Sequence, residues 1–200
     1  MGTSLIVSLV ILGLLVALVF WAVGIYNRLT SLRERTRNGF AQIDVQLERR
    51  YDLIPNLVEV AKGYMSHEKE TLDAVISARA SATAARVHVG GDPTNTGAMK
   101  ELGAAEGQLT QALGKLMMVS EAYPDLKANQ NMMQLTEELT STENKVAFAR
   151  QSYNDSVNTY NAYKKQVPPV LVANVAGFQD AEYLEIEESV KREAPKVAFS

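Results

Sequence analysis

The sequence contains no cysteine and only two histidines, His67 and His88. Without cysteine the chain cannot form a disulfide, a thiolate metal site or a cysteine nucleophile. Its formal net charge is only −3, and it has no clustered basic face of the kind that binds nucleic acid. These absences exclude a nucleic-acid binder and leave very little material for metal or acid–base chemistry.

The surroundings of the two histidines can be compared with two known metal-binding motifs. His67-Glu68 resembles the start of a zinc-protease helix, but Thr71 stands where the second histidine is needed. A di-iron bundle needs Glu three residues before each histidine, and those places hold Tyr64 and Ala85. We therefore expect no metal, no cofactor and no enzymatic activity, and we interpret His67 as part of a polar helix face with an inter-helix hydrogen bond.

Long uncharged runs are also scarce, except for one at the N-terminus. Residues 5–25 carry no charge, and at about 1.5 Å per residue a helix of this length crosses the roughly 30 Å of bilayer hydrocarbon. Trp21 and Tyr26 stand at one end, where such rings favour the headgroup level. A cleaved signal peptide is the competing interpretation, because residues 22–24 loosely resemble a cleavage site. The run is longer than a signal core and no Lys or Arg precedes it, which favours a transmembrane anchor over residues 1–27.

Flanking charge predicts the orientation of this anchor. Four arginines follow it, with Glu34 against them: Arg28, Arg33, Arg35 and Arg37. The positive-inside rule then places the C-terminal domain in the cytoplasm and the N-terminus outside, with membrane lipid as a partner.

Apolar residues recur at helical spacing through most of the remaining chain, so the predicted fold class is all-α. The anchor is expected to continue without a break into a long helix that ends near Val87 and is kinked at Pro55. A loop over residues 88–97 precedes two further antiparallel helices, over 98–122 and from Pro124 to about 166. Residues 28–166 thus form a helical bundle. Residues 167–200 form a short helix near 170–178 and a tail whose segments 183–186 and 197–199 dock on the bundle or on a neighbouring chain.

These lengths leave the membrane-proximal part of the first helix without a partner inside the chain. An exposed apolar stripe of this kind usually meets another molecule. We therefore predict a homo-oligomer that self-associates through the apolar residues of this part: Leu29, Leu32, Phe40, Ile43 and Leu47.

A second predicted cluster is polar. Arg50 falls in the apolar register of the first helix, and a buried arginine demands a carboxylate partner, for which Glu143 is the candidate. Solvated faces and helical ion pairs are the simpler explanation of the surrounding charges. The full predicted inter-helix network is Asp44, Arg49, Arg50, Asp52, Glu143 and Arg150.

The run IDVQLERRYDLIPNLV at residues 43–58 resembles the signature of the bacterial LemA family, and YPDLKAN at 123–129 extends the resemblance. The resemblance implies a membrane-anchored protein of long antiparallel helices in the bacterial inner membrane. It supplies no catalytic residues, and it implies links to membrane or envelope organisation and to HtpX-type membrane metalloproteases. Two hypotheses follow: a self-associating scaffold without catalytic activity, or an accessory subunit of such a protease.

Overall fold

A computed structural model describes residues 2–186, and among these residues every regular element is a helix. The elements are α1 (Gly2–Lys62), α2 (Lys69–Val89), α3 (Thr96–Ser120), α4 (Pro124–Lys127), α5 (Gln130–Lys165) and α6 (Pro169–Ala176). The predicted all-α class is confirmed.

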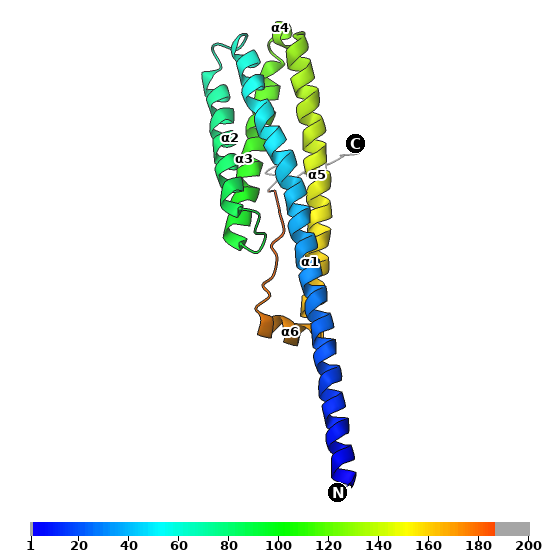
Figure 1. The fold of residues 1–200 in the computed structure, drawn as a ribbon. Helices are drawn as coiled ribbons and strands as arrows, with labels where there is room; N and C mark the ends of the chain where they lie inside the picture. The colour runs from blue at the N-terminus through cyan, green and yellow to red at the C-terminus, as the bar shows by residue number, and fades with distance from the viewer. Residues whose placement is uncertain (1, 187–200) are drawn as a thin grey trace, which may run out of the picture.

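Four long helices alternate in direction: α1 and α3 run one way, and α2 and α5 run the other (Figure 1). Helix α1 packs mainly against α5, and α2 packs mainly against α3. The short α4 lies at the end of the bundle far from the N-terminus, and α6 crosses the other end (Figure 1). After α6 the chain turns back, and residues 178–186, here called the strap, run along the bundle in extended form.

The predicted first helix does not reach Val87. It ends at Lys62, and residues 63–68 form a tight turn in which Tyr64 and Met65 both donate backbone hydrogen bonds to the Ala61 carbonyl. The Met65 side chain is fully buried inside this turn. A single glycine, Gly63, is a weak stop signal, so tertiary packing of Met65 decided a boundary that local sequence did not mark. Pro55 lies inside α1 and does not end it.

The other helix ends follow local capping rules. Gly90 ends α2 with φ of 56°, a left-handed conformation that glycine adopts without strain. The Asn95 side chain accepts a hydrogen bond from the Ala98 amide at the start of α3, and Asn129 does the same for Met132 at the start of α5. The predicted loop, second helix and short C-terminal helix are therefore present within a few residues. The predicted third helix is divided into α4 and α5.

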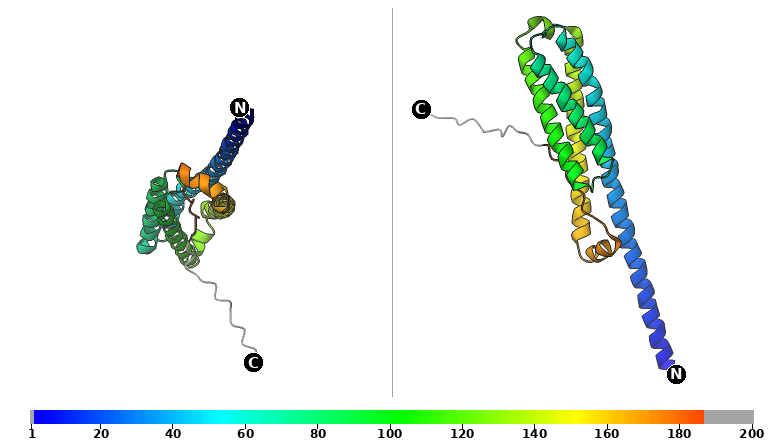
Figure 2. Two further views of the ribbon diagram at one scale, coloured as in Figure 1. Left: turned by 90° about the horizontal axis from the view of Figure 1, so that it is seen from below. Right: turned by 90° about the vertical axis from the view of Figure 1, so that its left-hand side faces the viewer.

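The N-terminal part of α1 extends beyond every other helix (Figures 1 and 2). Its most apolar 18-residue window has a mean hydropathy of 3.0, and none of that window is buried by the protein. A helix with this length and composition can cross a membrane. The same helix then continues without a break into the bundle, as predicted.

The expectation of an unpartnered stripe on the proximal part of α1 is wrong. Helix α5 is long enough to return along α1 almost to the anchor, and the two helices share the largest interface in the fold. All five residues of the stripe are consequently at most 3% exposed: Leu29, Leu32, Phe40, Ile43 and Leu47. These side chains belong to the core of the single chain, and self-association through them would require α5 to leave.

Candidate functional site

A buried ionic cluster joins the α1/α5 pair to the α2/α3 pair. Arg50 of α1 donates from one guanidinium nitrogen to Glu106 Oε2 of α3 at 2.9 Å, and from the other to Thr110 Oγ1 at 2.9 Å. Tyr51 donates its hydroxyl to the other oxygen of Glu106. The Arg50 and Glu106 side chains are 2% and 0% exposed, so these two charges depend on each other rather than on water.

The electrostatics of this cluster are dominated by burial. Burial raises the pKa of Glu106, whereas the Arg50 charge and the Tyr51 hydrogen bond oppose that shift. Burial, together with the charge of Glu106, also raises the pKa of Tyr51 far above its usual value, so the phenol stays protonated and donates. The opposite charges of Arg50 and Glu106 are paired, although the buried Arg50 Nε has no hydrogen-bond partner, and this pairing fixes the register of α1 against α3.

A more exposed layer lies beside this cluster. The Arg86 guanidinium of α2 lies 3.3 Å from Asp44 and 3.7 Å from Glu48, both on α1. Arg79 of α2 donates from Nε to the Tyr51 carbonyl at 2.8 Å. Two arginines of α2 thus bond to α1 across this interface.

The predicted network is thus present in part and wrong in its central pairing. Arg50 is buried as expected, but its partner is Glu106 and not Glu143, which lies exposed on α5. Asp44 takes part through Arg86. Four predicted members form no ion pair or hydrogen bond within residues 2–186: Arg49, Asp52, Glu143 and Arg150.

Glu106 was not predicted, although the sequence carried a signal for it. Leu102, Glu106, Leu109 and Leu113 follow the four-three-four spacing of a buried helix face, and all four are buried. A single acid in that spacing on one helix and a single arginine in the same kind of spacing on another identify a buried pair.

Side chains of α5 hold the strap through its backbone. Asn161 brackets Ala181: its amide donates to the Ala181 carbonyl at 2.8 Å, and its carbonyl accepts from the Ala181 amide at 3.0 Å. One heptad earlier, Asn154 accepts from the Leu184 amide at 3.0 Å and donates to the Leu184 carbonyl at 3.3 Å. Because these bonds reach the peptide group, they hold an extended chain as a neighbouring strand would.

Two tyrosines complete this ladder. The Tyr153 hydroxyl donates to the Glu182 carbonyl at 2.5 Å, and the Tyr160 hydroxyl donates to the Gln179 carbonyl at 2.7 Å. The opposite side of the strap packs against α3. Leu184 of the strap is 1% exposed, and the Glu185 carbonyl passes directly over Gly103 of α3. The predicted docking of residues 183–186 therefore occurs on the chain's own bundle. The second predicted docking segment, 197–199, lies outside the described residues.

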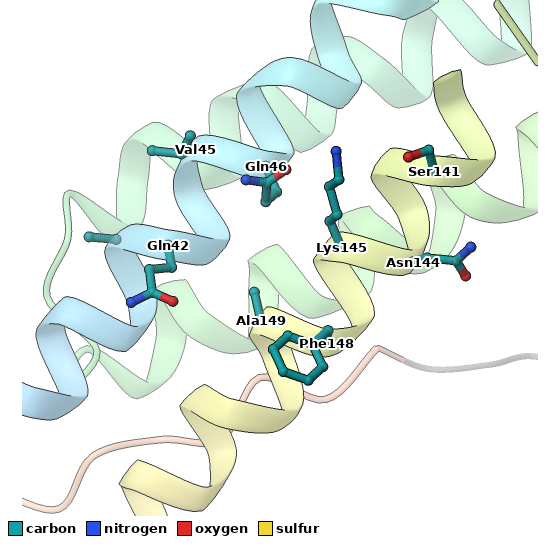
Figure 3. Close-up of a pocket in the computed structure, with 9 residues that line it drawn as sticks. Gln42, Val45, Gln46, Ser141, Asn144, Lys145, Phe148 and Ala149 are labelled. Atoms are coloured by element: carbon teal, nitrogen blue, oxygen red, sulfur yellow. The ribbon is translucent and has the colours of Figure 1, made fainter. Parts of the chain in front are cut away.

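An open groove of about 780 Å³ runs between α1 and α5 on the outside of the bundle (Figure 3). Val45, Phe148 and Ala149 give it an apolar surface, and the polar residues along it are Gln42, Gln46, Ser141, Asn144 and Lys145. Val45 is 59% exposed and Phe148 is 76% exposed. An exposed phenylalanine beside an apolar groove is a typical feature of a protein contact surface.

The two histidines lie apart from each other and from any acidic cluster. His67 is exposed in the turn between α1 and α2 rather than on a helix face, so the predicted inter-helix role is wrong. His88 Nδ1 lies 2.8 Å from Glu101 Oε2, an exposed contact between α2 and α3. No group of three or more potential metal ligands comes together in the described part of the chain.

Comparison with known proteins gives a family and several relatives. The family model described as LemA family matches residues 39–199. Magnetosome protein MamQ 2 of Paramagnetospirillum magneticum is 26% identical over 175 residues, which cover 80% of this chain and 64% of that protein. Magnetosome protein MamQ of Magnetospirillum gryphiswaldense is 26% identical over 173 residues, covering 79% and 64%.

A third relative, Protein LemA of Metamycoplasma hominis, is 24% identical over 143 residues, covering 72% of this chain and 61% of that protein. The chain thus spans somewhat less than two thirds of the length of the curated relatives it matches.

Proposed function

This chain belongs to the LemA family, and on that premise we propose that it is a non-catalytic scaffold, anchored in a membrane, that self-associates to organise that membrane. The magnetosome proteins among its relatives agree with a role at a membrane. The sequence has only two histidines and no cysteine, and the buried charges of the described part are paired with one another. This composition favours a structural role over a chemical one.

The observation that carries the proposal is the continuity of α1. Its N-terminal part is apolar and unburied, whereas its C-terminal part supplies much of the bundle core. Because one helix does both, the bundle cannot swing about the anchor as it would on a flexible linker. Such a protein holds its binding surfaces at a fixed height above the bilayer.

The α1/α5 groove is the surface through which copies would meet. Every copy carries the same anchor, so the groove of one copy and Phe148 of its neighbour lie at the same height in a shared membrane. Because the exposed Phe148 ring and the apolar groove lie at one height, the same contact can form between any two neighbouring copies. Polar residues along the groove keep this contact compatible with exposure of the free monomer.

The proposed location is the bacterial inner membrane, crossed once, with the N-terminus outside and the bundle in the cytoplasm. The four arginines that follow the anchor support this orientation.

Cysteine cross-linking tests the proposal directly, because the natural chain has no cysteine. Phe148→Cys, in membranes treated with a short bifunctional maleimide, should give a covalent dimer. The matched control is Val87→Cys on α2. Val87 is 67% exposed, and its neighbour Arg86 pairs with Asp44, the residue next to Val45, so the two sites lie at a similar height. The proposal predicts much less dimer for Val87→Cys.

Mass measurement after extraction in mild detergent distinguishes the alternatives. A homo-oligomer that Phe148→Asp dissociates supports the scaffold. A fixed complex with a different membrane protein would instead support an accessory subunit, for example of a membrane metalloprotease. Monomer at every concentration, together with equal cross-linking at positions 87 and 148, would contradict self-association through this groove.

A further inference from the structure

Helix α6 lies at the level where α1 leaves the apolar window. It crosses the end of the bundle nearest the N-terminus and packs on α1 and α5 (Figure 1). Ile25 of α1 is buried at this level, and the Tyr26 ring meets the Phe178 ring edge to face at 5.5 Å. The Arg33 guanidinium also lies over the Phe178 ring, with its central carbon 5.1 Å from the ring centroid. The position of α6 along α1 is therefore fixed by direct contacts.

The two faces of α6 are both apolar, but only one is covered. Pro169 and Ala173, four residues apart, are buried against the bundle. Leu171 and Val175 lie on the opposite side of the helix and are 64% and 92% exposed. Val167, in the turn between α5 and α6, is 82% exposed. Asn174 is the only polar residue in the helix. An exposed face of this composition is costly in water.

We propose that α6 lies flat in the membrane interface, with its exposed side chains in the boundary between lipid headgroups and acyl chains. The proposal rests on the membrane anchor proposed above. Two observations favour lipid over a protein partner: α6 lies beside the end of the apolar part of α1, where Phe178 meets Tyr26, and its exposed face is opposite the face that the bundle covers. Arg28 is exposed close to this level and suits anionic headgroups, and Lys165, also exposed there, lies 3.3 Å from Asp180.

A second membrane contact changes what the anchor can do. A single transmembrane helix restrains its own rotation and tilt only through the side chains beside the span, here aromatic rings such as Trp21 and arginines such as Arg28. A short interfacial helix held to the side of that helix adds a second point of contact with the membrane, and it therefore restricts both rotation and tilt. In the chain α6 lies between α5 and the strap, so binding of α6 to the membrane would also fix the position of the first residues of the strap.

Spin labels on single cysteines test the proposal in the full chain, reconstituted in vesicles of phosphatidylcholine and phosphatidylglycerol. Leu171→Cys and Val175→Cys report on the exposed face of α6. Met118→Cys, which is 73% exposed near the opposite end of the bundle, is the water-facing control, and Val16→Cys reports on the anchor. Collisions with oxygen, which concentrates in lipid, are compared with collisions with a neutral nickel chelate, which stays in water.

We expect the labels at 171 and 175 to collide more with oxygen than with nickel, like the label at 16, and the label at 118 to show the reverse. Labels at 171 and 175 that behave like the one at 118, while the label at 16 remains in lipid, would overturn the proposal for α6 alone. Protection of 171 and 175 from both reagents would overturn it in favour of a protein contact. A water-exposed label at 16 would overturn the anchor itself, and this outcome is distinguishable from the other two.

Discussion

Arg50 and Glu106 illustrate how one pair of residues sets the relation between two helix pairs. Each is a charge in an apolar register, and each would be destabilising alone. Together with Tyr51 they form a buried cluster, bounded by the hydroxyl of the exposed Thr110, that only one register of α1 against α3 can satisfy. The specificity comes from desolvation, because a shifted register would leave both charges unpaired.

Arg50→Met should lower the free energy of unfolding by about 3–5 kcal/mol, because it leaves the Glu106 charge buried without a counter-charge. Urea unfolding of the detergent-solubilised chain, followed by circular dichroism, measures this. Arg49→Met is the control: Arg49 is exposed and forms no ion pair in residues 2–186, so its loss should change stability by no more than about 0.5 kcal/mol. Equal effects of the two substitutions would contradict the assigned role.

The double variant Arg50→Met with Glu106→Gln should recover much of the loss, since no unpaired charge remains. In Arg50→Met alone the pKa of Glu106 should rise further than in the natural chain. A carboxyl group whose folded pKa is raised binds its proton more tightly in the folded state, so the deficit should shrink as pH falls.

The ion pairs of Asp180 stabilise the docked strap, and they make this stabilisation depend on pH. Its carboxylate lies 2.5 Å from Lys164 Nζ and 3.3 Å from Lys165 Nζ. The hydrogen bond from Lys164 lowers the pKa of Asp180 below its usual value of 3.8. A lowered folded pKa means that this stabilisation is present above the unfolded pKa and is lost as pH falls through the folded pKa.

Hydrogen exchange should therefore show weaker protection of the Ala181 amide at about pH 3 than at about pH 6, after correction for intrinsic exchange. Asp180→Asn should abolish this difference near Ala181. Persistence of the same pH dependence in Asp180→Asn would assign it to another carboxyl group.

At the scale of elements, the strap depends on a helix that presents polar side chains at heptad spacing. Tyr153 with Asn154, and Tyr160 with Asn161, repeat every seven residues and therefore lie along one side of α5. The facing helix contributes Gly103, whose missing side chain makes room for the Glu185 carbonyl. An extended segment is thus held between two helices without any strand partner.

Gly103→Ala should displace the strap, because a Cβ atom there would clash with the Glu185 carbonyl oxygen. We expect lost protection of the Leu184 amide and a lower melting temperature. Gly114→Ala in the same helix is the matched control: a Cβ there meets nothing within 4 Å, so the change should stabilise α3 by about 0.5–1 kcal/mol. If both substitutions stabilise equally, the close passage of the strap over Gly103 is wrong.

At the scale of the whole molecule, the fold is one long helix, α1, whose C-terminal part is a member of the helical bundle. From residue 25 to Lys62 α1 is roughly 55 Å long at about 1.5 Å per residue, which is shorter than predicted because the helix ends before α2 begins. Because α5 returns along that whole length, the α1/α5 pair extends to the level of α6, beside the end of the apolar part of α1. The proposed scaffold and the proposed interfacial helix both follow from this compact shape, since it leaves the α1/α5 groove and the α6 face as the apolar surfaces beside the membrane-proximal core.

The sequence by itself determined the helical class, the apolar N-terminal segment, its continuity with the first helix and the stop at Gly90. The caps at Asn95 and Asn129 are equally local but were not predicted, and one uninterrupted helix was expected across Asn129. These features depend on residues near one another in the chain, where periodicity and capping chemistry act. The LemA signature in the sequence likewise predicted the family that the family model confirms.

Only the tertiary structure decided which surfaces stay free. It ended α1 at Lys62 because Met65 is buried in a turn, and it covered the proximal stripe because α5 returns along it. It also paired Arg50 with Glu106 instead of Glu143, and it placed the strap between α3 and α5. Each of these outcomes joins residues far apart in the chain. Helical periodicity gives the direction in which a side chain points, but not which neighbour it meets.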